Sequence, residues 1–152
     1  MASMTADRTA GRAQQLKLQS LISDMELLWP WVDEIAAAYA IPNDLQFAIH
    51  LCLEEAVSNV IRHGYGADPG HPVTVNFTPS ESHELVFTVI DEAPPFNPLE
   101  MAALPDPPPP SSVEQLRPGG HGIRLMRKFA GGLTYERLPG GNRLTIRFTN
   151  HS

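Results

Sequence analysis

Two hydrophobic periods divide the chain into predicted strands and predicted helices. Apolar residues that alternate with polar ones lie on one face of a strand, whereas apolar residues that recur every three or four positions lie on one face of a helix. Alternation predicts strands at 16–22 and 73–78, and the segment 84–91 is apolar on both faces, which is typical of a central strand. The last two strands form one predicted hairpin, and 133–138 and 143–148 form another.

The first helical segment begins near Ser23 and Glu26, which have the spacing of a capping box. Pro30 must lie in the first turn of this helix or kink it. The apolar stripe of the helix consists of Leu28, Val32, Ile35 and Tyr39. A shorter helix is expected over 119–132, and its inward side chains are Ile123, Met126, Phe129 and Ala130.

The second helical segment follows a break at Pro42, and Asn43 is its expected N-cap. It is expected to run to about His63, because Gly64 and Gly66 suit a helix end. Its apolar stripe consists of Leu45, Ala48, Ile49, Cys52, Ala56 and Val60. The second hairpin carries strong turn chemistry, Pro-Gly-Gly-Asn, between its strands.

The order of elements predicts an α+β fold. Helices that are segregated from antiparallel strand pairs favour a two-layer sandwich, in which one mixed, mainly antiparallel sheet is covered on one face by helices. Residues 1–14 are small and polar and are expected to be a disordered tail, so that 15–150 form a single domain. The proline-rich segment 92–118 has no regular pattern, which is typical of a functional lid or a disordered insert.

Composition and charge exclude several classes of protein. The net charge of −6 and the pI near 5.4 argue against nucleic acid or an anionic membrane as the main partner. No apolar run approaches the roughly 20 residues that span a bilayer, and the N-terminus lacks the apolar stretch of a secretory signal. A cytoplasmic protein is therefore expected. Cys52, the single cysteine, is expected in the core, and the histidines show no zinc-ligand spacing.

Three polar features could be surface or could form a site. Glu55, Asn59 and His63 recur at steps of four, so a helix would place them on one face. Asp91 ends the central strand, where an aspartate is often only a turn residue. The sequence Gly-Gly-His-Gly at 119–122 opens a helix, either as a flexible joint or as an anion site.

If these three features converge, they have the chemistry of a nucleotide site. Free N–H groups at a glycine-led helix start bind phosphate, and an asparagine oxygen can complete the ligands of a Mg²⁺ held by phosphates and water. A carboxylate one turn away can deprotonate a nucleophile, and a buried aspartate can accept a hydrogen bond from an exocyclic amine. The Walker pattern, the dinucleotide-binding fingerprint and the protein-kinase motifs are absent from the sequence.

Three stretches of the chain resemble the N, G1 and G2 boxes of the GHKL ATPase superfamily in order and spacing. They are EEAVSNVIRHGY (54–65), DEAPPFNP (91–98) and GGHGIRLM (119–126). Within this superfamily, the chain is most similar to the small bacterial anti-sigma-factor serine/threonine kinases. The resemblance implies a Bergerat-type ATP-binding fold that uses ATP and Mg²⁺.

The resemblance also implies a role for each matched residue. Glu55 matches the catalytic base, Asn59 the Mg²⁺ ligand, His63 a position near the phosphates, and Asp91 the residue that reads the adenine amino group. The mobile ATP lid corresponds to about 97–119. The further nucleotide contacts that it implies are Ala93, Phe96, Gly119, Gly120, His121, Gly122 and Ile123.

Two departures from the family pattern bear on turnover. Ala93 stands where the G1 box has its first glycine, which adds a methyl group near the base and resists positive φ. The lid is rich in proline, which favours extended geometry over a freely folding hinge.

By the resemblance, such a kinase phosphorylates a serine or threonine of a STAS-type anti-sigma-factor antagonist, binds a sigma factor and often forms a homodimer. One alternative is a nucleotide-binding regulatory module that acts by stoichiometric protein binding without phosphoryl transfer. Another is the detached catalytic domain of a histidine kinase, but no helical hairpin with a phosphorylatable histidine precedes the domain in this sequence.

Overall fold

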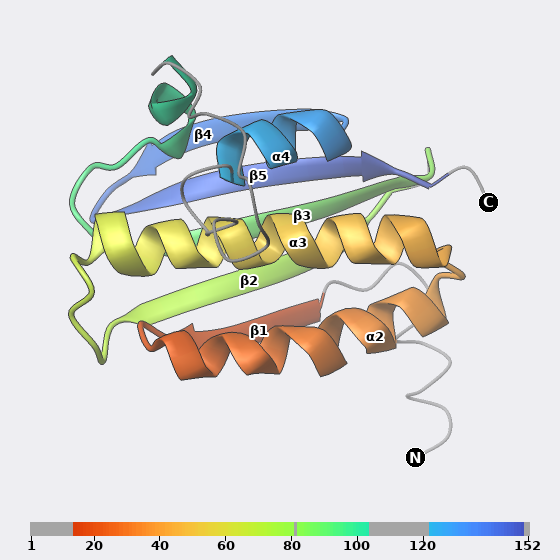
Figure 1. The fold of residues 1–152 in the computed structure, drawn as a ribbon, viewed down its shortest axis with the longest axis horizontal. Coiled ribbons are helices and arrows are strands. Elements are labelled where there is room, and N and C mark those ends of the chain that lie inside the picture. Colours follow the sequence, from red (N-terminus) through yellow and green to blue (C-terminus); the bar gives the residue numbers. More distant parts are fainter. Residues whose placement is uncertain (1–13, 81, 104–121, 151–152) are drawn as a thin grey trace, which may run out of the picture.

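The computed structural model describes residues 14–80, 82–103 and 122–150, and the side chains at 101–103 and 122–125 fall outside that description. Its strands form one sheet in the order β1-β2-β3-β5-β4, and the helices cover one face of it (Figure 1). The strands are β1 Gln14–Gln19, β2 Pro72–Pro79, β3 Glu84–Asp91, β4 Gly132–Leu138 and β5 Gly141–Thr149. The helical elements are η1 Ile22–Leu27, α2 Leu28–Ala38, α3 Asn43–Asn59, η2 Val60–Gly64, η3 Pro98–Ala103 and α4 Gly122–Phe129.

The expected α+β sandwich is confirmed. All four pairings between the described strands are antiparallel, so this part of the sheet lacks the parallel pair that a mixed sheet would contain. The strand β3 lies at the centre of the sheet, as its apolar faces predicted. Both predicted hairpins, β2–β3 and β4–β5, are present.

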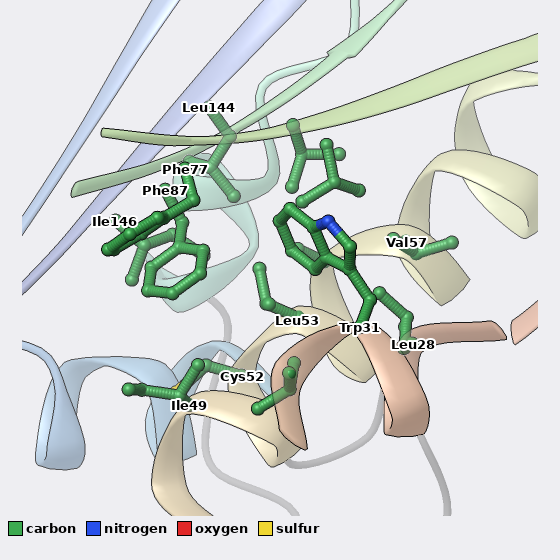
Figure 2. Close-up of a cluster of buried hydrophobic side chains, with 14 of the residues drawn as sticks. Leu28, Trp31, Ile49, Cys52, Leu53, Val57, Phe77, Phe87, Leu144 and Ile146 are labelled. Atoms are coloured by element: carbon green, nitrogen blue, oxygen red, sulfur yellow. The ribbon is translucent and has the colours of Figure 1, made fainter. Parts of the chain in front are cut away.

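The core lies between the helices and the covered face of the sheet. Trp31 of α2 and Leu53 of α3 point toward the aromatic side chains of β2 and β3 (Figure 2). Phe77 and Phe87 are fully buried, with ring centroids 4.9 Å apart. Burial of an aromatic side chain contributes roughly 1.5–3 kcal/mol relative to exposure, so this layer supplies much of the stability that holds α3 in place.

The first helical region differs from the predicted capping box. The strand β1 ends at Gln19, earlier than predicted, and the 3₁₀ helix η1 follows Leu21 without a side-chain cap. Instead of Ser23, Asp24 accepts a hydrogen bond from the backbone N–H of Gln19 at 2.9 Å. Pro30 lies in the first turn of α2, as predicted, and the predicted stripe of that helix is buried or packs against the core.

The helix α3 begins one residue earlier than predicted, so its N-cap is Pro42 and not Asn43. Pro42 precedes the helix in an extended conformation, so Asn43 is the first helical residue and caps nothing with its side chain. The apolar stripe faces the core as predicted, and the helix continues through η2 to Gly64, close to the predicted end. The segment η2 is a single π-helical turn, a feature that is frequent at functional sites.

The predicted C-terminal helix and hairpin are present, although the helix and the segment before it differ in detail from the prediction. The helix α4 is shorter than predicted, and Phe129 is 38% exposed, although Met126 is fully buried. Part of the segment 92–118 is regular, because η3 occupies 98–103 in its first half. Residues 1–13 and 104–121 lie outside the described residues, and Gln14, which was assigned to the tail, belongs to β1.

Candidate functional site

Two polar side chains of α3 face inward near the end of the helix. Glu55 and Asn59 are one turn apart, and their exposed fractions are 5% and 0%. Both the Oδ1 and the Nδ2 atom of Asn59 are buried, and neither has a hydrogen-bond partner among the described residues. A buried polar group without a partner costs roughly 1–3 kcal/mol. An amide kept at this cost is the type of group that a ligand satisfies.

His63 does not share the face of Glu55 and Asn59 as the steps of four predicted. Its side chain is exposed and stacks on Phe96 of the G1 segment, with ring centroids 5.9 Å apart. The cause is η2, because a π-helical turn inserts one residue into the helical repeat and so rotates the residues that follow it. His63 therefore lies beside the loop that follows β3.

Asp91 is buried at the end of β3 and holds the loop that follows. Its Oδ1 atom accepts hydrogen bonds from the backbone N–H of Ala93 at 2.9 Å and from Nδ2 of Asn142 at 2.8 Å. Burial raises the pKa of Asp91, and the hydrogen bonds and the nearby guanidinium of Arg137 oppose this rise. The aspartate is therefore part of a built network rather than an exposed turn residue.

Asp91 and Phe96 line one cavity with the end of the N-box helix. The cavity measures about 10 Å³, enough for roughly one water molecule. A purine is several times larger than this volume. The lining residues are Ala56, Val60, Val89, Asp91, Phe96, Pro98, Tyr135, Asn142 and Leu144. Glu55 and Asn59 directly precede two of these residues but do not line the cavity themselves.

Ala93 is accommodated without the backbone strain that its place in the G1 box suggested. Its φ is not positive, and its side chain is 1% exposed. A Cβ added at Gly64 would lie 3.2 Å from the Ala93 methyl group, so the missing side chain of Gly64 makes room for it. The methyl group that Ala93 adds to the G1 loop (residues 92–98) therefore fits into the space that Gly64 leaves open at the end of the N box.

The glycine-rich G2 segment is only partly described. Gly119, Gly120 and His121 lie outside the described residues, as does the lid from 104 onward. Gly122 is the first residue of α4, and Ile123 follows it in the helix. The helix α4 packs beside α3 (Figure 1). The structure thus brings the G2 helix next to the N-box helix, as the resemblance requires.

Tyr65 joins the end of the N box to the start of the G1 box. Its hydroxyl group donates to the carbonyl oxygen of Pro72 and accepts from the backbone N–H of Glu92, both at 2.7 Å. Its ring stacks on His71. These contacts fix the distance between the helix that holds Asn59 and the strand that holds Asp91.

Sequence reasoning missed Asn142, which was assigned to a turn. The turn consists of Pro139 and Gly140, whose φ is +80°, and β5 begins at Gly141. Asn142 is therefore a strand residue, and it lies opposite Asp91 in the β3–β5 register. The alternation of apolar residues in β5 could have identified it, because Asn142 lies two residues before Leu144 and therefore on the same buried face.

Other titratable side chains of α3 are buried for packing. Cys52 is fully buried, and burial raises the pKa of its thiol to about 12, which confirms it as a core residue. His50 is 2% exposed and stacks on Trp29, and burial lowers its pKa to about 4.

Within the described ranges, no group of three or more His, Cys, Asp and Glu residues could hold a metal ion. No described helix is long and apolar enough to cross a membrane.

Comparison with solved structures shows that the fold recurs in other bacterial proteins. The chain superimposes on the RsbU and RsbW domains of a Mycobacterium tuberculosis protein with a TM-score of 0.65 and 14% identity, covering 91% of this chain and 32% of that one. It also superimposes on one chain in the structure of the SiaB–SiaC complex from Pseudomonas aeruginosa, with a TM-score of 0.57 and 16% identity, covering 97% of this chain and 96% of that one. At these identities, the likeness extends to the fold alone.

Sequence comparison gives the family. The chain is 34% identical over 123 residues to the serine/threonine-protein kinase BtrW of Bordetella bronchiseptica, covering 80% of this chain and 82% of that protein. The profile of the histidine kinase-like ATPase domain matches residues 18–148, which include β2, β3, β4, all of β5 except its last residue, and all the described helices. The resemblance to GHKL ATPases is thereby confirmed. The chain belongs to the family of histidine kinase-like ATPase domains.

Proposed function

We propose that this protein is a Mg²⁺-ATP-dependent serine/threonine protein kinase of the anti-sigma-factor class, acting in the cytoplasm. The observation that favours it most is the fully buried Asn59 amide, which lacks a partner in the described part and stands one turn from the buried Glu55. An amide and a carboxylate in this relation fit metal binding and proton abstraction. The 34% identity to a serine/threonine-protein kinase supports the same activity.

In this proposal, Glu55 accepts the proton of the attacking hydroxyl group. The hydroxyl oxygen forms a bond to the γ-phosphorus of ATP while the bond from that phosphorus to the β,γ-bridging oxygen breaks, and ADP leaves. When bound, Mg²⁺ would neutralise the charge that develops on the phosphate oxygens. The Oδ1 atom of Asn59 is the protein ligand that would hold it. Asp91 accepts from the adenine amino group, and the amides of Gly120 and Gly122 hold the phosphates.

The remaining nucleotide contacts follow the same order along the chain. Phe96 lines the cavity and stacks on His63, so both side chains would border the nucleotide. The backbone N–H of Ala93 donates to the Asp91 carboxylate, which places Ala93 beside the proposed adenine contact. Gly119, His121 and Ile123 would complete the G2 contacts.

The proposed substrate is a serine or threonine of a STAS-type anti-sigma-factor antagonist, and the proposed regulatory partner is a sigma factor, with this chain acting as a homodimer. A phosphoserine adds nearly two negative charges. Because this chain carries a net charge of −6, the phosphorylated product would be repelled and the partner exchanged. The similarity to a structure of a two-protein complex, SiaB–SiaC, is consistent with action on a protein partner.

The test is phosphoryl transfer from radiolabelled ATP to such an antagonist, comparing the wild type with Glu55→Gln. This variant keeps the size of the side chain and removes its ability to accept the proton. We expect the transfer rate to fall about 10²–10⁴-fold while ATP still binds. Glu54→Gln is the matched control, because Glu54 is half-buried on the same helix but lines a different groove, and its transfer rate should stay at the wild-type level. Normal transfer by Glu55→Gln would refute the assigned role.

A second candidate is a regulatory module that binds nucleotide and a partner without transferring phosphate. The features that favour it are Ala93 in the G1 box and the proline-rich lid, which depart from the pattern of the family. The same assay distinguishes the two candidates. Label on a serine or threonine of the antagonist supports the kinase, binding without transfer supports the module, and acid-labile label on a histidine supports a histidine kinase.

A further inference from the structure

Asn142 has the most completely used polar side chain near the candidate site. It is 3% exposed, and its Nδ2 atom donates to Oδ1 of Asp91 at 2.8 Å. The same nitrogen lies 3.0 Å from the carbonyl oxygen of Pro94 and 3.3 Å from that of Ala93. These acceptors belong to the end of β3 and to the G1 loop. One amide group therefore joins the buried carboxylate to the loop that closes the cavity.

The opposite side of the amide faces donors only. Its Oδ1 atom accepts from the backbone N–H of Phe96 at 3.1 Å and from the hydroxyl group of Tyr135. Nη1 of Arg137 lies 3.4 Å from it and also donates to the carbonyl oxygen of Ala93 at 2.8 Å. Because donors surround the oxygen and acceptors surround the nitrogen, only one orientation of the amide satisfies its neighbours.

This network distinguishes the two oxygens of Asp91. Oδ1 accepts from both the side-chain amide of Asn142 and the backbone N–H of Ala93, and the backbone of Asn142 is a further hydrogen-bond partner of the carboxylate. Asp91 also lines the cavity. A carboxylate whose first oxygen is held by two fixed donors cannot rotate freely, so its second oxygen keeps one direction.

We propose that Asn142 is the positioning residue for base recognition: it fixes the rotation of the Asp91 carboxylate and the position of the G1 loop, and thereby selects a purine with an amino group at position 6. This inference rests on the proposed contact between Asp91 and adenine. A carboxylate oxygen held toward the base accepts from the amino group of ATP and repels the carbonyl oxygen of ITP at the same position. A freely rotating carboxylate would discriminate less.

The experiment measures the affinities of the full-length protein for ATP and ITP by calorimetric titration. For the wild type, we expect about 10- to 100-fold tighter binding of ATP, the effect of one hydrogen bond to a charged group. Asn142→Asp replaces the donor by an acceptor in the same volume, and Asn142→Ala removes it. In both variants, we expect the preference for ATP to fall to about 3-fold or less while ITP affinity is retained.

Asn76→Asp is the matched control. Asn76 also links neighbouring strands, because its amide accepts from Gln15 and donates to Thr88, but it lies on β2 away from the cavity. Its preference for ATP should equal that of the wild type. If Asn142→Asp does not fold, Asn142→Ala and the milder Tyr135→Phe still provide the test.

The outcomes separate two failures. A wild type that does not bind ATP overturns the proposed function itself. If the wild type prefers ATP and Asn142→Ala keeps that preference, or loses affinity for both nucleotides equally, the proposed function stands and the positioning role of Asn142 is wrong.

Discussion

Asn59 and Asp91 are both buried at the candidate site, but their surroundings differ. The carboxylate of Asp91 is held by two hydrogen bonds, and the amide that donates one of them is itself fully bonded. The amide of Asn59 has no partner for either polar atom among the described residues. The first region is preorganised by the protein, whereas the second is left unsatisfied at a cost to stability. In the proposed site, the group that would recognise the base is therefore held by the fold, whereas the amide that would bind the metal gains a partner only when the metal is bound.

The largest effect is expected where the backbone of β5 approaches Asp91. A Cβ at Gly141 would lie 2.0 Å from the carbonyl oxygen of Asp91, too close for any side chain. Gly141→Ala should therefore separate β5 from β3 at the site and lower the free energy of unfolding by at least about 3 kcal/mol. Gly140→Ala is the control, because the space there is open and only its φ of +80° resists alanine. It should cost about 1 kcal/mol in chemical denaturation. Equal losses would show that the approach of the two strands is not the constraint.

An effect of intermediate size is expected when the amides of Asn142 and Asn59 are replaced, and the change in the free energy of unfolding should differ in sign between the two positions. Asn142→Leu removes the partners of Asp91, Phe96 and Tyr135, and should destabilise the protein by about 2–3 kcal/mol. Asn59→Leu replaces an amide without a partner in the described part by an apolar group of similar size. It should leave stability unchanged or raise it by about 1 kcal/mol. Denaturant unfolding of both variants without nucleotide checks this. A large loss in Asn59→Leu would mean that its amide is already satisfied by the protein.

The smallest effect is expected at the departure from the G1 pattern. Because the φ of Ala93 is not positive, Ala93→Gly gains no conformational relief, and it should change ATP affinity by less than about 3-fold. Gly64→Ala should be more harmful, since its new methyl group would meet that of Ala93 at 3.2 Å. The double variant should recover most of this loss. Titration of the three variants with ATP checks the series, and a large gain of affinity in Ala93→Gly would show that the methyl group obstructs the base.

The sequence was sufficient to predict the layers of the fold because its hydrophobic periods match the burial. The central position of β3 followed from residues that are apolar on both faces, and the stripe of α3 followed from spacing. Glu55 and Asn59 were identified by their spacing of four along one helical face, and Asp91 by its place at the end of the central strand. Their burial and the cavity beside Asp91 are seen in the structure, whereas their roles in nucleotide binding stay predictions.

Other features depend on geometry that no local pattern contains. The π-helical turn that rotates His63 has no signature in the residues 60–64. Asn142 carries turn chemistry in its sequence neighbourhood, and only the pairing of β5 with β3 places it opposite Asp91. The absence of a side chain at Gly64 leaves room for the methyl group of Ala93, although the two residues are far apart in the chain. Local sequence rules describe one element at a time, so they miss contacts between elements.

The central claim is that Asn59 and Asp91 belong to one Mg²⁺-ATP site. The most direct test is a calorimetric titration of the wild type and Asn59→Ala with ATP, each with and without Mg²⁺. We expect Mg²⁺ to tighten ATP binding by the wild type and to have little effect on Asn59→Ala, while both proteins bind metal-free ATP with similar affinity. Equal tightening by Mg²⁺ in both proteins would contradict the account.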